Sequence, residues 1–389
     1  MILYIDPGTG GVIINVLIAI TSSIVYFFRK FFFKNINSDL KKKSEISIFS
    51  EGNQYRNTFL PIVNELIKRE ILFNYYTLDY QDLILEIDSE FINSKFLGLG
   101  TLGKLKFSSI SSNLLVSTTP NIGNSEFPLK RPKKVKELIH VWHSISDISY
   151  YKKGSLDNYD TVLTVGDFQN KSIREIEKLR NLKPKKLIPV GLPYFDVFSE
   201  KLNDFKPTNQ SILIASSWGD KGLLKNYGFE IINILQDYNI IIRPHPQSFI
   251  SEKGFIENFK SICMSKSNIE WDESSDPLKS FSKSKLIISD TSSIRFDYSF
   301  LTDKPVITLK IKKESLHEYE ADYIEDIWGK KTESLLGPVL DKKNIAEINQ
   351  EIESLLNNEI AGKSINTLKT KTICSIGESS TKIVQYLTS

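Results

Sequence analysis

Two histidines stand at the ends of predicted strands, where a parallel sheet presents side chains to a ligand. The chain has four histidines in 389 residues. His143 ends the apolar run 137–142, and His245 follows the run 240–242. An imidazole titrates near neutral pH, so His143 is predicted to be the base that takes a proton from an acceptor hydroxyl. The alternative is a half-buried histidine that packs beside Trp142.

The segment Arg243-Pro244-His245-Pro246 places a cation and an imidazole on a rigid backbone. Prolines on both sides restrict the backbone at His245, and Pro244 excludes helical geometry at Arg243. A guanidinium fork matches phosphate oxygens, so Arg243 is predicted to bind a donor phosphate. His245 is predicted to donate a hydrogen bond to a phosphate oxygen of the same donor. The alternative is a rigid turn in which the histidine is incidental.

A hydroxyl-rich turn follows the apolar run 285–289 and opens a predicted helix over 292–301. Backbone N–H groups at a helix start are free and positively polarised, so this turn is a predicted donor-phosphate site. Its residues are Asp290, Thr291, Ser292 and Ser293. Ordinary N-capping explains the same residues without a ligand. Asp297, one helical turn further on, is expected to brace this turn or to reach the ligand.

A second loop, after the run 211–215, offers Ser216 and Trp218 as contacts for a nucleotide or an acceptor. The alternative is a strand-to-helix loop with a tryptophan in the core. The sequence contains no G-x-G-x-x-G after a first strand and no P-loop, which disfavours dinucleotide oxidoreductases and P-loop ATPases. It also contains no D-x-D-like pair at a strand end, so we expect no cofactor and no obligate metal. Helix N-termini and cationic side chains are expected to neutralise the diphosphate instead.

The elements that position these residues alternate between apolar runs of strand length and helical stretches. This alternation predicts an α/β fold with two Rossmann-like domains facing across a cleft, over 35–200 and 201–389. The net charge is only +3, which argues against a nucleic-acid partner. The chain has two cysteines, Cys263 and Cys374, far apart in sequence, so a disulfide scaffold or a zinc site is not expected.

Residues 11–28 contain no charged side chain and are followed by Arg29 and Lys30. Eighteen helical residues span about 27 Å, close to the hydrocarbon thickness of a bilayer. The first 34 residues are therefore predicted to form a single-pass anchor in the cell membrane, with the catalytic domains in the cytoplasm. A buried core helix or a membrane-surface helix is the alternative.

Five segments in order resemble the CDP-glycerol glycerophosphotransferases of teichoic-acid synthesis, which have the two-Rossmann GT-B fold. The segments are Val141–His143, Gly191–Pro193 with Asp196, Ile212–Trp218, Arg243–Pro246, and Ser289–Ser293 with Phe296-Asp297 followed by Asp303-Lys304-Pro305. The resemblance implies that His143 is needed for transfer, that His245 lies near the donor phosphates, and that Ser292 and Ser293 hold the diphosphate. It adds Gly191 to the candidate nucleotide or acceptor contacts.

The implied reaction moves glycerol phosphate, or a related group, from a CDP-activated donor to a lipid-linked or polymeric acceptor at the membrane. The sequence departs from the family at Ser144, where glycine is usual, and at Thr291, where tyrosine is common. A nucleotide-sugar glycosyltransferase or capsule-synthesis enzyme of the same fold stays open as an alternative. A non-catalytic membrane scaffold is a third possibility, since fold alone does not determine function.

Overall fold

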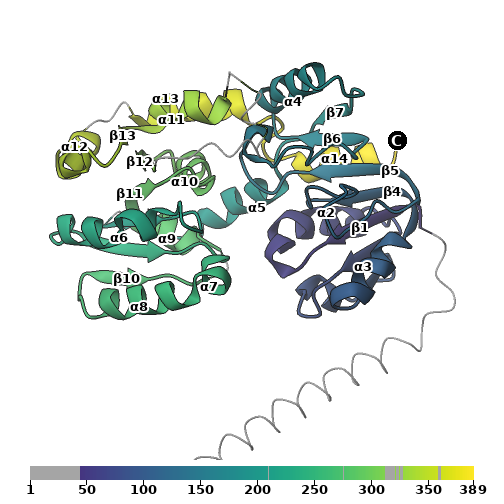
Figure 1. The fold of residues 1–389 in the computed structure, drawn as a ribbon, viewed down its shortest axis with the longest axis horizontal. Helices are drawn as coiled ribbons and strands as arrows, with labels where there is room; N and C mark the ends of the chain where they lie inside the picture. Colours follow the sequence, from purple (N-terminus) through teal and green to yellow (C-terminus); the bar gives the residue numbers. More distant parts are fainter. Residues whose placement is uncertain are drawn as a thin grey trace, which may run out of the picture. The chain divides into compact units, whose positions relative to one another are not determined.

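Two parallel β-sheets, each flanked by helices, make up the computed structural model of this chain (Figure 1). The structure describes residues 44–208, 210–274, 276–311, 320, 324, 327–357 and 361–389. The chain divides into the units Met1–Ser44 and Glu45–Ser389, and both sheets belong to the second unit. The predicted membrane anchor lies outside the described residues. Within them, no helix combines the length and the apolar character that crossing a bilayer requires.

The first sheet defines the N-terminal lobe, and its neighbouring strands all pair in parallel in the order β3-β2-β1-β4-β5-β6-β7. The strands are β1 (Ile46–Ser50), β2 (Phe73–Thr77), β3 (Ile92–Phe96), β4 (Ser111–Ser117), β5 (Lys134–Val141), β6 (Thr161–Thr164) and β7 (Lys186–Pro189). Strands β1 and β6 are buried along their whole length. Such continuous burial needs helices on both faces of a sheet. The helices are α2 (Arg56–Lys68), α3 (Gly100–Ser108), α4 (Asp167–Leu179) and α5 (Pro193–Leu202).

The second sheet defines the C-terminal lobe and is also parallel, in the order β10-β9-β8-β11-β12-β13. The strands are β8 (Ser211–Ala215), β9 (Asn239–Arg243), β10 (Ile269–Trp271), β11 (Ser284–Ser289), β12 (Val306–Leu309) and β13 (Val339–Leu340). Its helices are α6 (Leu223–Ile234), α7 (Ser248–Ser251), α8 (Lys253–Met264), α9 (Leu278–Lys283), α10 (Ile294–Thr302), α11 (Trp328–Leu336), α12 (Ile348–Leu356) and α13 (Ala361–Thr372). The last helix, α14 (Ser379–Leu387), packs on the N-terminal lobe. The predicted pair of Rossmann-like α/β lobes is confirmed.

The sequence analysis did not predict helices α3 and α5. Helix α3 contains Gly100 and Gly103, which weaken the helical signal. Gly103 is nevertheless required there, because a β-carbon would lie 2.2 Å from the Gly98 carbonyl oxygen. Helix α5 begins at Pro193, whose fixed φ suits the first helical position. In α3 the tertiary contacts override a weak local preference, whereas the start of α5 follows a local signal.

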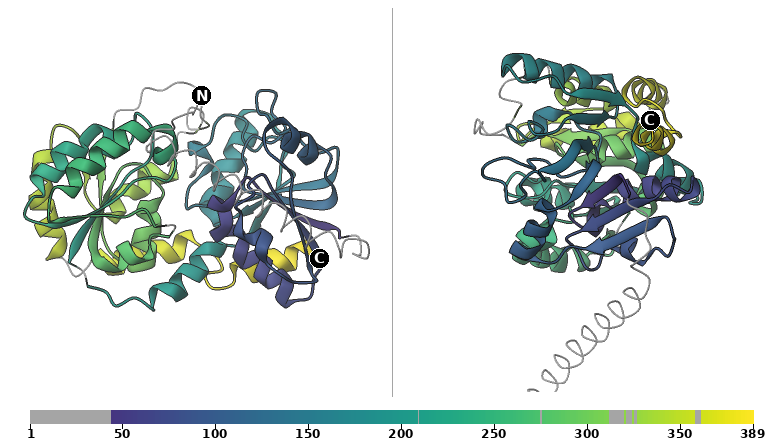
Figure 2. Two further views of the ribbon diagram at one scale, coloured as in Figure 1. Left: turned by 90° about the horizontal axis from the view of Figure 1, so that it is seen from below. Right: turned by 90° about the vertical axis from the view of Figure 1, so that its right-hand side faces the viewer.

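The C-terminal segment returns to the N-terminal lobe, where α14 packs against α2 (Figures 1 and 2). The Cys374 N–H donates to the Val165 carbonyl over 2.9 Å, and the Leu192 N–H donates to Ser379 Oγ over 2.9 Å. Asp196 accepts hydrogen bonds from the backbone N–H groups of Gly377 and Ser379. The chain therefore crosses between the lobes a second time, a feature that the predicted division at residue 200 does not contain.

Candidate active site

The ends of three neighbouring strands bring polar side chains together in the N-terminal lobe. Glu51 directly follows β1, Thr118 and Thr119 follow β4, and His143 comes two residues after β5. Strands β1, β4 and β5 are adjacent and parallel, so their carboxyl ends lie at one edge of the sheet. In open parallel sheets this edge is where ligands bind.

His143 is partly buried and packs edge-on against Tyr55, with 5.1 Å between the ring centroids. Its Nδ1 atom is buried and has no hydrogen-bond partner among the described residues. Burial, reinforced by the positive charge of protonated His245, lowers the pKa of His143 to about 4. The imidazole is therefore neutral at physiological pH and able to accept a proton. The same coupling shows that His143 and His245 lie within electrostatic reach of each other, although they belong to different lobes.

His245 follows β9 and is also partly buried. Its Nδ1 accepts a hydrogen bond from the Gln247 N–H over 3.1 Å, so the ring proton is assigned to Nε2. Burial lowers the pKa of His245 to about 4; the charge of Glu252 opposes this shift and that of Arg243 adds to it. His245 thus presents a neutral ring with one N–H donor.

Arg243 is buried, and its terminal nitrogens are taken by groups of its own lobe. One nitrogen (NH1) lies 2.6 Å from Asp272 Oδ2 and 3.1 Å from Ser274 Oγ, and the other (NH2) donates to the Ser274 carbonyl over 2.9 Å. These contacts anchor the end of β9 to the loop after β10. A direct bond to donor phosphate, as predicted for Arg243, requires these contacts to be exchanged, and that role stays a prediction.

Asp290 joins three loops at the carboxyl edge of the C-terminal sheet. Its carboxylate accepts from the backbone N–H groups of Ser217 (2.9 Å), Leu223 (2.8 Å) and Ser292 (2.8 Å). Asp290 is 1% exposed, so its observed contacts are structural, and the predicted phosphate contact is a role that they do not test.

The rest of the serine turn is open. Thr291 is exposed, and Ser292 and Ser293 are partly buried. The hydroxyls of these three residues make no hydrogen bond to a described residue. Ser289 Oγ, just before the turn, is buried and also lacks a partner within the described chain. These hydroxyls lie before α10, where free N–H groups and the helix dipole favour an anion.

The loop after β8 places Trp218 at the surface, 51% exposed. The alternative of a core tryptophan is therefore wrong. Ser216 is buried and its hydroxyl donates to the Ser217 carbonyl over 2.5 Å, within the loop that Asp290 holds. Glu252 accepts from the Gly219 N–H over 2.8 Å, which ties this loop to the segment following His245.

Asp297 and Gly191 make contacts within the protein. The Tyr194 hydroxyl donates to Asp297 Oδ1 over 2.5 Å, which joins α5 to α10. Burial raises the pKa of Asp297 to about 7. Gly191 has φ +88°, and a β-carbon there would lie 2.4 Å from the Cys374 carbonyl oxygen. The contacts of Asp297 are those of a bracing residue, and those of Gly191 serve the return of the C-terminal segment.

Glu51 and Tyr55 belong to this edge and were missed by the sequence analysis. Burial raises the pKa of Glu51, and burial together with the charge of Glu51 raises the pKa of Tyr55 to about 12. The available signal was a carboxylate two residues after the predicted strand over 44–49, the same kind of signal that singled out His143.

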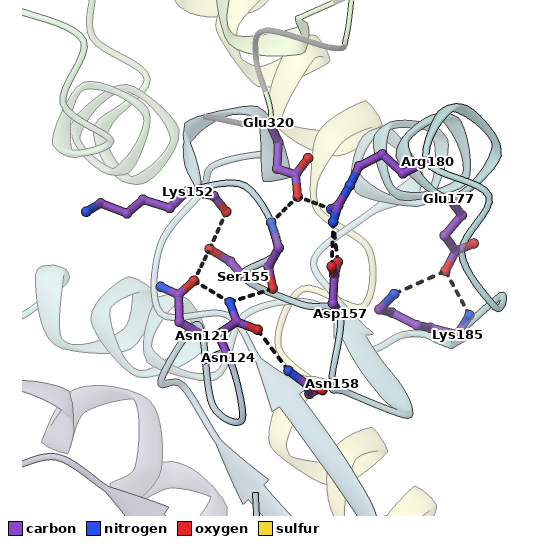
Figure 3. A network of polar contacts seen from close by, with 11 residues as sticks. Asn121, Asn124, Lys152, Ser155, Asp157, Asn158, Glu177, Arg180, Lys185 and Glu320 are labelled. Atoms are coloured by element: carbon purple, nitrogen blue, oxygen red, sulfur yellow. Dashed lines mark hydrogen bonds and ion pairs between the residues drawn. The ribbon is translucent and has the colours of Figure 1, made fainter. Parts of the chain in front are cut away.

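A polar network holds the segment after His143 in place (Figure 3). Glu320, which lies between β12 and α11 in sequence, accepts from the Gly154 N–H and from Arg180, both over 2.8 Å. The Asn121 side chain accepts from Ser155 Oγ over 3.0 Å. Through these bonds the loops after β4 and β5 are fixed to each other and to a segment of the C-terminal lobe.

No protein-family model matches the chain, and no curated protein matches it. The fold is shared with solved structures. The wall teichoic acid polymerase TagF is 16% identical with a TM-score of 0.56, over 89% of this chain and 88% of that chain. The UDP-GlcNAc 2-epimerase of Methanocaldococcus jannaschii, solved with UDP-GlcNAc and UDP, is 16% identical with a TM-score of 0.57, over 88% and 99%.

A glycosyltransferase from Rickettsia africae is 14% identical with a TM-score of 0.54, over 89% of this chain and 98% of that chain. At such identities the likeness concerns the fold. The chain has the two-domain GT-B fold, and the predicted resemblance to the teichoic-acid polymerases is confirmed at that level.

Proposed function

We propose that this protein is a transferase that moves glycerol phosphate, or a related group, from a CDP-activated donor to a hydroxyl of a membrane-linked surface-polymer precursor. The observation that carries the proposal is that His143 and His245, from the strand ends of different lobes, lie close enough for a charge on His245 to lower the pKa of His143. A proton acceptor and a hydrogen-bond donor within reach of each other suit transfer from a diphosphate.

The reaction follows from these roles. The acceptor oxygen attacks the phosphorus that carries glycerol, a new O–P bond forms, and the bond to CMP breaks. The hydroxyl proton goes to the neutral imidazole of His143, which releases it to solvent. The Nε2–H of His245 donates to a phosphate oxygen, and the hydroxyls of Ser292 and Ser293 with the Ser293 N–H stabilise the remaining negative charge.

Arg243 and Asp290 contribute by positioning in this proposal. Arg243 holds the His245 segment against Asp272, and Asp290 holds the serine turn against the loop of Ser217. Residues 11–28 are proposed as the membrane anchor that keeps the domains beside a lipid-linked acceptor. No cofactor and no metal takes part in the proposed reaction.

A nucleotide-sugar glycosyltransferase is the second candidate, because the epimerase structure with the same fold contains UDP-GlcNAc and UDP. The two candidates differ in the leaving group. Transfer from a CDP-activated polyol releases CMP, whereas transfer from a nucleotide sugar releases a nucleoside diphosphate.

The test uses the full-length protein in detergent. Thermal shift with CDP-glycerol, CDP-ribitol and UDP-GlcNAc identifies the donor, and chromatography of the nucleotide product identifies the leaving group. We expect a shift with a CDP donor and release of CMP. Absence of a shift with every donor refutes the proposal, and release of UDP establishes the second candidate.

The variant His143→Ala tests the catalytic role. It should lower turnover at least about 100-fold, the usual contribution of a general base, while the donor-induced thermal shift is kept. Added imidazole should restore part of the rate, because it supplies the missing base. A His143→Ala protein of normal activity removes His143 from the mechanism.

A further inference from the structure

A carboxylate at the edge of the N-terminal sheet has no charged partner within the described part of the chain. Glu51 is partly buried, and it forms no ion pair with any residue that the structure describes. Most buried carboxylates are paired, because removing a charge from water is costly. Glu51 is therefore an exception that calls for a ligand or for protonation.

The backbone around Glu51 is built to hold it. Ser50 Oγ donates to the Gly52 carbonyl over 2.9 Å and accepts from the Gly52 N–H over 3.2 Å. Asp79 accepts from the Asn53 N–H over 3.1 Å. The turn that carries Glu51 is thus fixed on both sides, which distinguishes it from an exposed loop.

The surroundings of Glu51 are hydroxyls and rings. Its charge raises the pKa of Tyr55 after the larger effect of burial, so the carboxylate lies near the phenol that contacts His143. Thr119 is close enough to lower the pKa of Glu51, although its hydroxyl makes no hydrogen bond of normal geometry to a described residue. The neighbouring residue Thr118 is fully buried, and its Oγ1 has no hydrogen-bond partner in the described chain either.

We propose that Glu51, with the Thr118 and Thr119 hydroxyls, forms the acceptor subsite and binds the uncharged polyol hydroxyls at the reacting end of the acceptor. This inference rests on the proposed function and deepens it. One hydroxyl of a vicinal diol donates to the Glu51 carboxylate, which leaves its neighbour beside His143.

The chemistry of the subsite selects against an anionic end. A carboxylate attracts a hydroxyl donor and repels a phosphate, whereas the open serine turn at α10 has the polarity that phosphate prefers. The two lobes thus divide the substrates by charge. The N-terminal edge takes the neutral nucleophile, and the C-terminal edge takes the diphosphate.

The test compares Glu51→Gln with Glu90→Gln in the full-length protein. Glu90 is exposed, so its variant loses the same charge outside the subsite. The probes are a short glycerol-phosphate oligomer ending in a free diol and the same oligomer ending in a phosphate monoester. Binding is measured by ligand-observed NMR, and transfer is measured with CDP-glycerol.

We expect wild type and Glu90→Gln to bind the diol-ended oligomer more tightly than the phosphate-ended one. Glu51→Gln should weaken diol binding roughly tenfold, the size of a hydrogen bond to a charged group, and should reduce the preference between the two ends. The acceptor KM should rise by a similar factor, with the donor KM and the CDP-glycerol thermal shift unchanged. Glu51→Asp should recover part of the loss.

Equal diol binding by Glu51→Gln and Glu90→Gln overturns the inference, as does a wild-type protein that binds neither oligomer. Neither result touches the donor assays. Conversely, Glu51-dependent diol binding without any donor-induced shift leaves the subsite standing and refutes the proposed transfer. A Glu51→Gln protein that binds neither the oligomer nor CDP-glycerol has lost its fold or both sites, and it counts against a subsite confined to the acceptor.

Discussion

The carboxyl edges of the two sheets treat their polar side chains in opposite ways. At the C-terminal edge the charged side chains have partners inside the protein. Arg243 forms an ion pair with Asp272, and Asp290 accepts hydrogen bonds from three backbone N–H groups. At the N-terminal edge Glu51 lacks an ion pair, and Thr118 Oγ1 and His143 Nδ1 lack hydrogen-bond partners among the described residues.

The difference separates scaffolding from binding. Internal partners at the C-terminal edge leave hydroxyls and helix N–H groups as the free donors, which suits a diphosphate. Unpaired acceptors and donors at the N-terminal edge suit a hydroxylated ligand that completes their hydrogen bonds. The hydroxyl of Ser289 at the C-terminal edge is also buried without a partner among the described residues. The difference between the two edges therefore concerns mainly their charged side chains.

Asp290→Ala tests the scaffold side with the largest expected effect. The change removes a buried carboxylate that accepts three backbone N–H groups, so the free energy of unfolding should fall by about 3–5 kcal/mol. Urea denaturation measures this loss. A variant that unfolds like wild type but has lost the donor-induced shift makes Asp290 a ligand contact and breaks the comparison.

Arg243→Ala should lower the free energy of unfolding by about 3 kcal/mol, because it leaves the half-buried carboxylate of Asp272 without its cation. A double-mutant cycle with Asp272→Asn isolates the pair, and we expect a coupling energy of about 1–3 kcal/mol. If the cycle shows no coupling while donor affinity drops sharply, Arg243 binds phosphate directly.

The fully buried His140 should make the stability of the N-terminal lobe depend on pH. Burial lowers its pKa to about 3, so the folded state binds fewer protons than the unfolded state, whose histidine titrates near 6.5. Stability is therefore complete above pH 6.5 and should decline by a few kcal/mol as the pH falls from about 6.5 towards 3. His140→Gln should flatten this dependence in urea titrations at pH 7 and pH 4.5; an unchanged slope contradicts the assignment.

Asp297 in the C-terminal lobe should make stability depend on pH in the opposite direction. Its pKa is raised from 3.8 to about 7, so the folded state holds the proton longer and stability declines as the pH rises from about 4 to 7. Asp297→Asn removes this term and should be about 2 kcal/mol more stable than wild type at pH 8, with no advantage at pH 4. Calorimetry at the two pH values decides; a loss at pH 8 gives the ionised carboxylate a role.

Thr118→Val should have the smallest effect on stability, and it tests whether the N-terminal edge binds the acceptor. Replacing a buried hydroxyl without a partner by a methyl group of the same shape should leave the free energy of unfolding within about 1 kcal/mol. The acceptor KM should nevertheless rise a few-fold. Loss of several kcal/mol indicates that the hydroxyl already has a partner inside the protein.

The ends of these strands could be predicted from the sequence. The hydrogen-bond and ion-pair partners of the residues that follow the strands could not. Apolar runs predicted β5, β8, β9 and β11 with small errors at their ends, because buried parallel strands are apolar on both faces. The same runs placed His143, His245 and the serine turn at one kind of edge. The pairing of Arg243 with Asp272 joins residues 29 apart, and no local pattern encodes which of several charges meet.

What the sequence by itself determined is therefore the alternation of strands and helices, the two-lobe fold and the chemical types at the strand ends. The tertiary structure alone decided that Arg243 and Asp290 have partners inside the protein and that Glu51 forms no ion pair with a described residue. It also decided that Trp218 is exposed and that α14 packs against α2. The physical reason is range: periodicity and turn chemistry act over a few residues, whereas burial and charge pairing depend on which distant segments meet when the chain is packed.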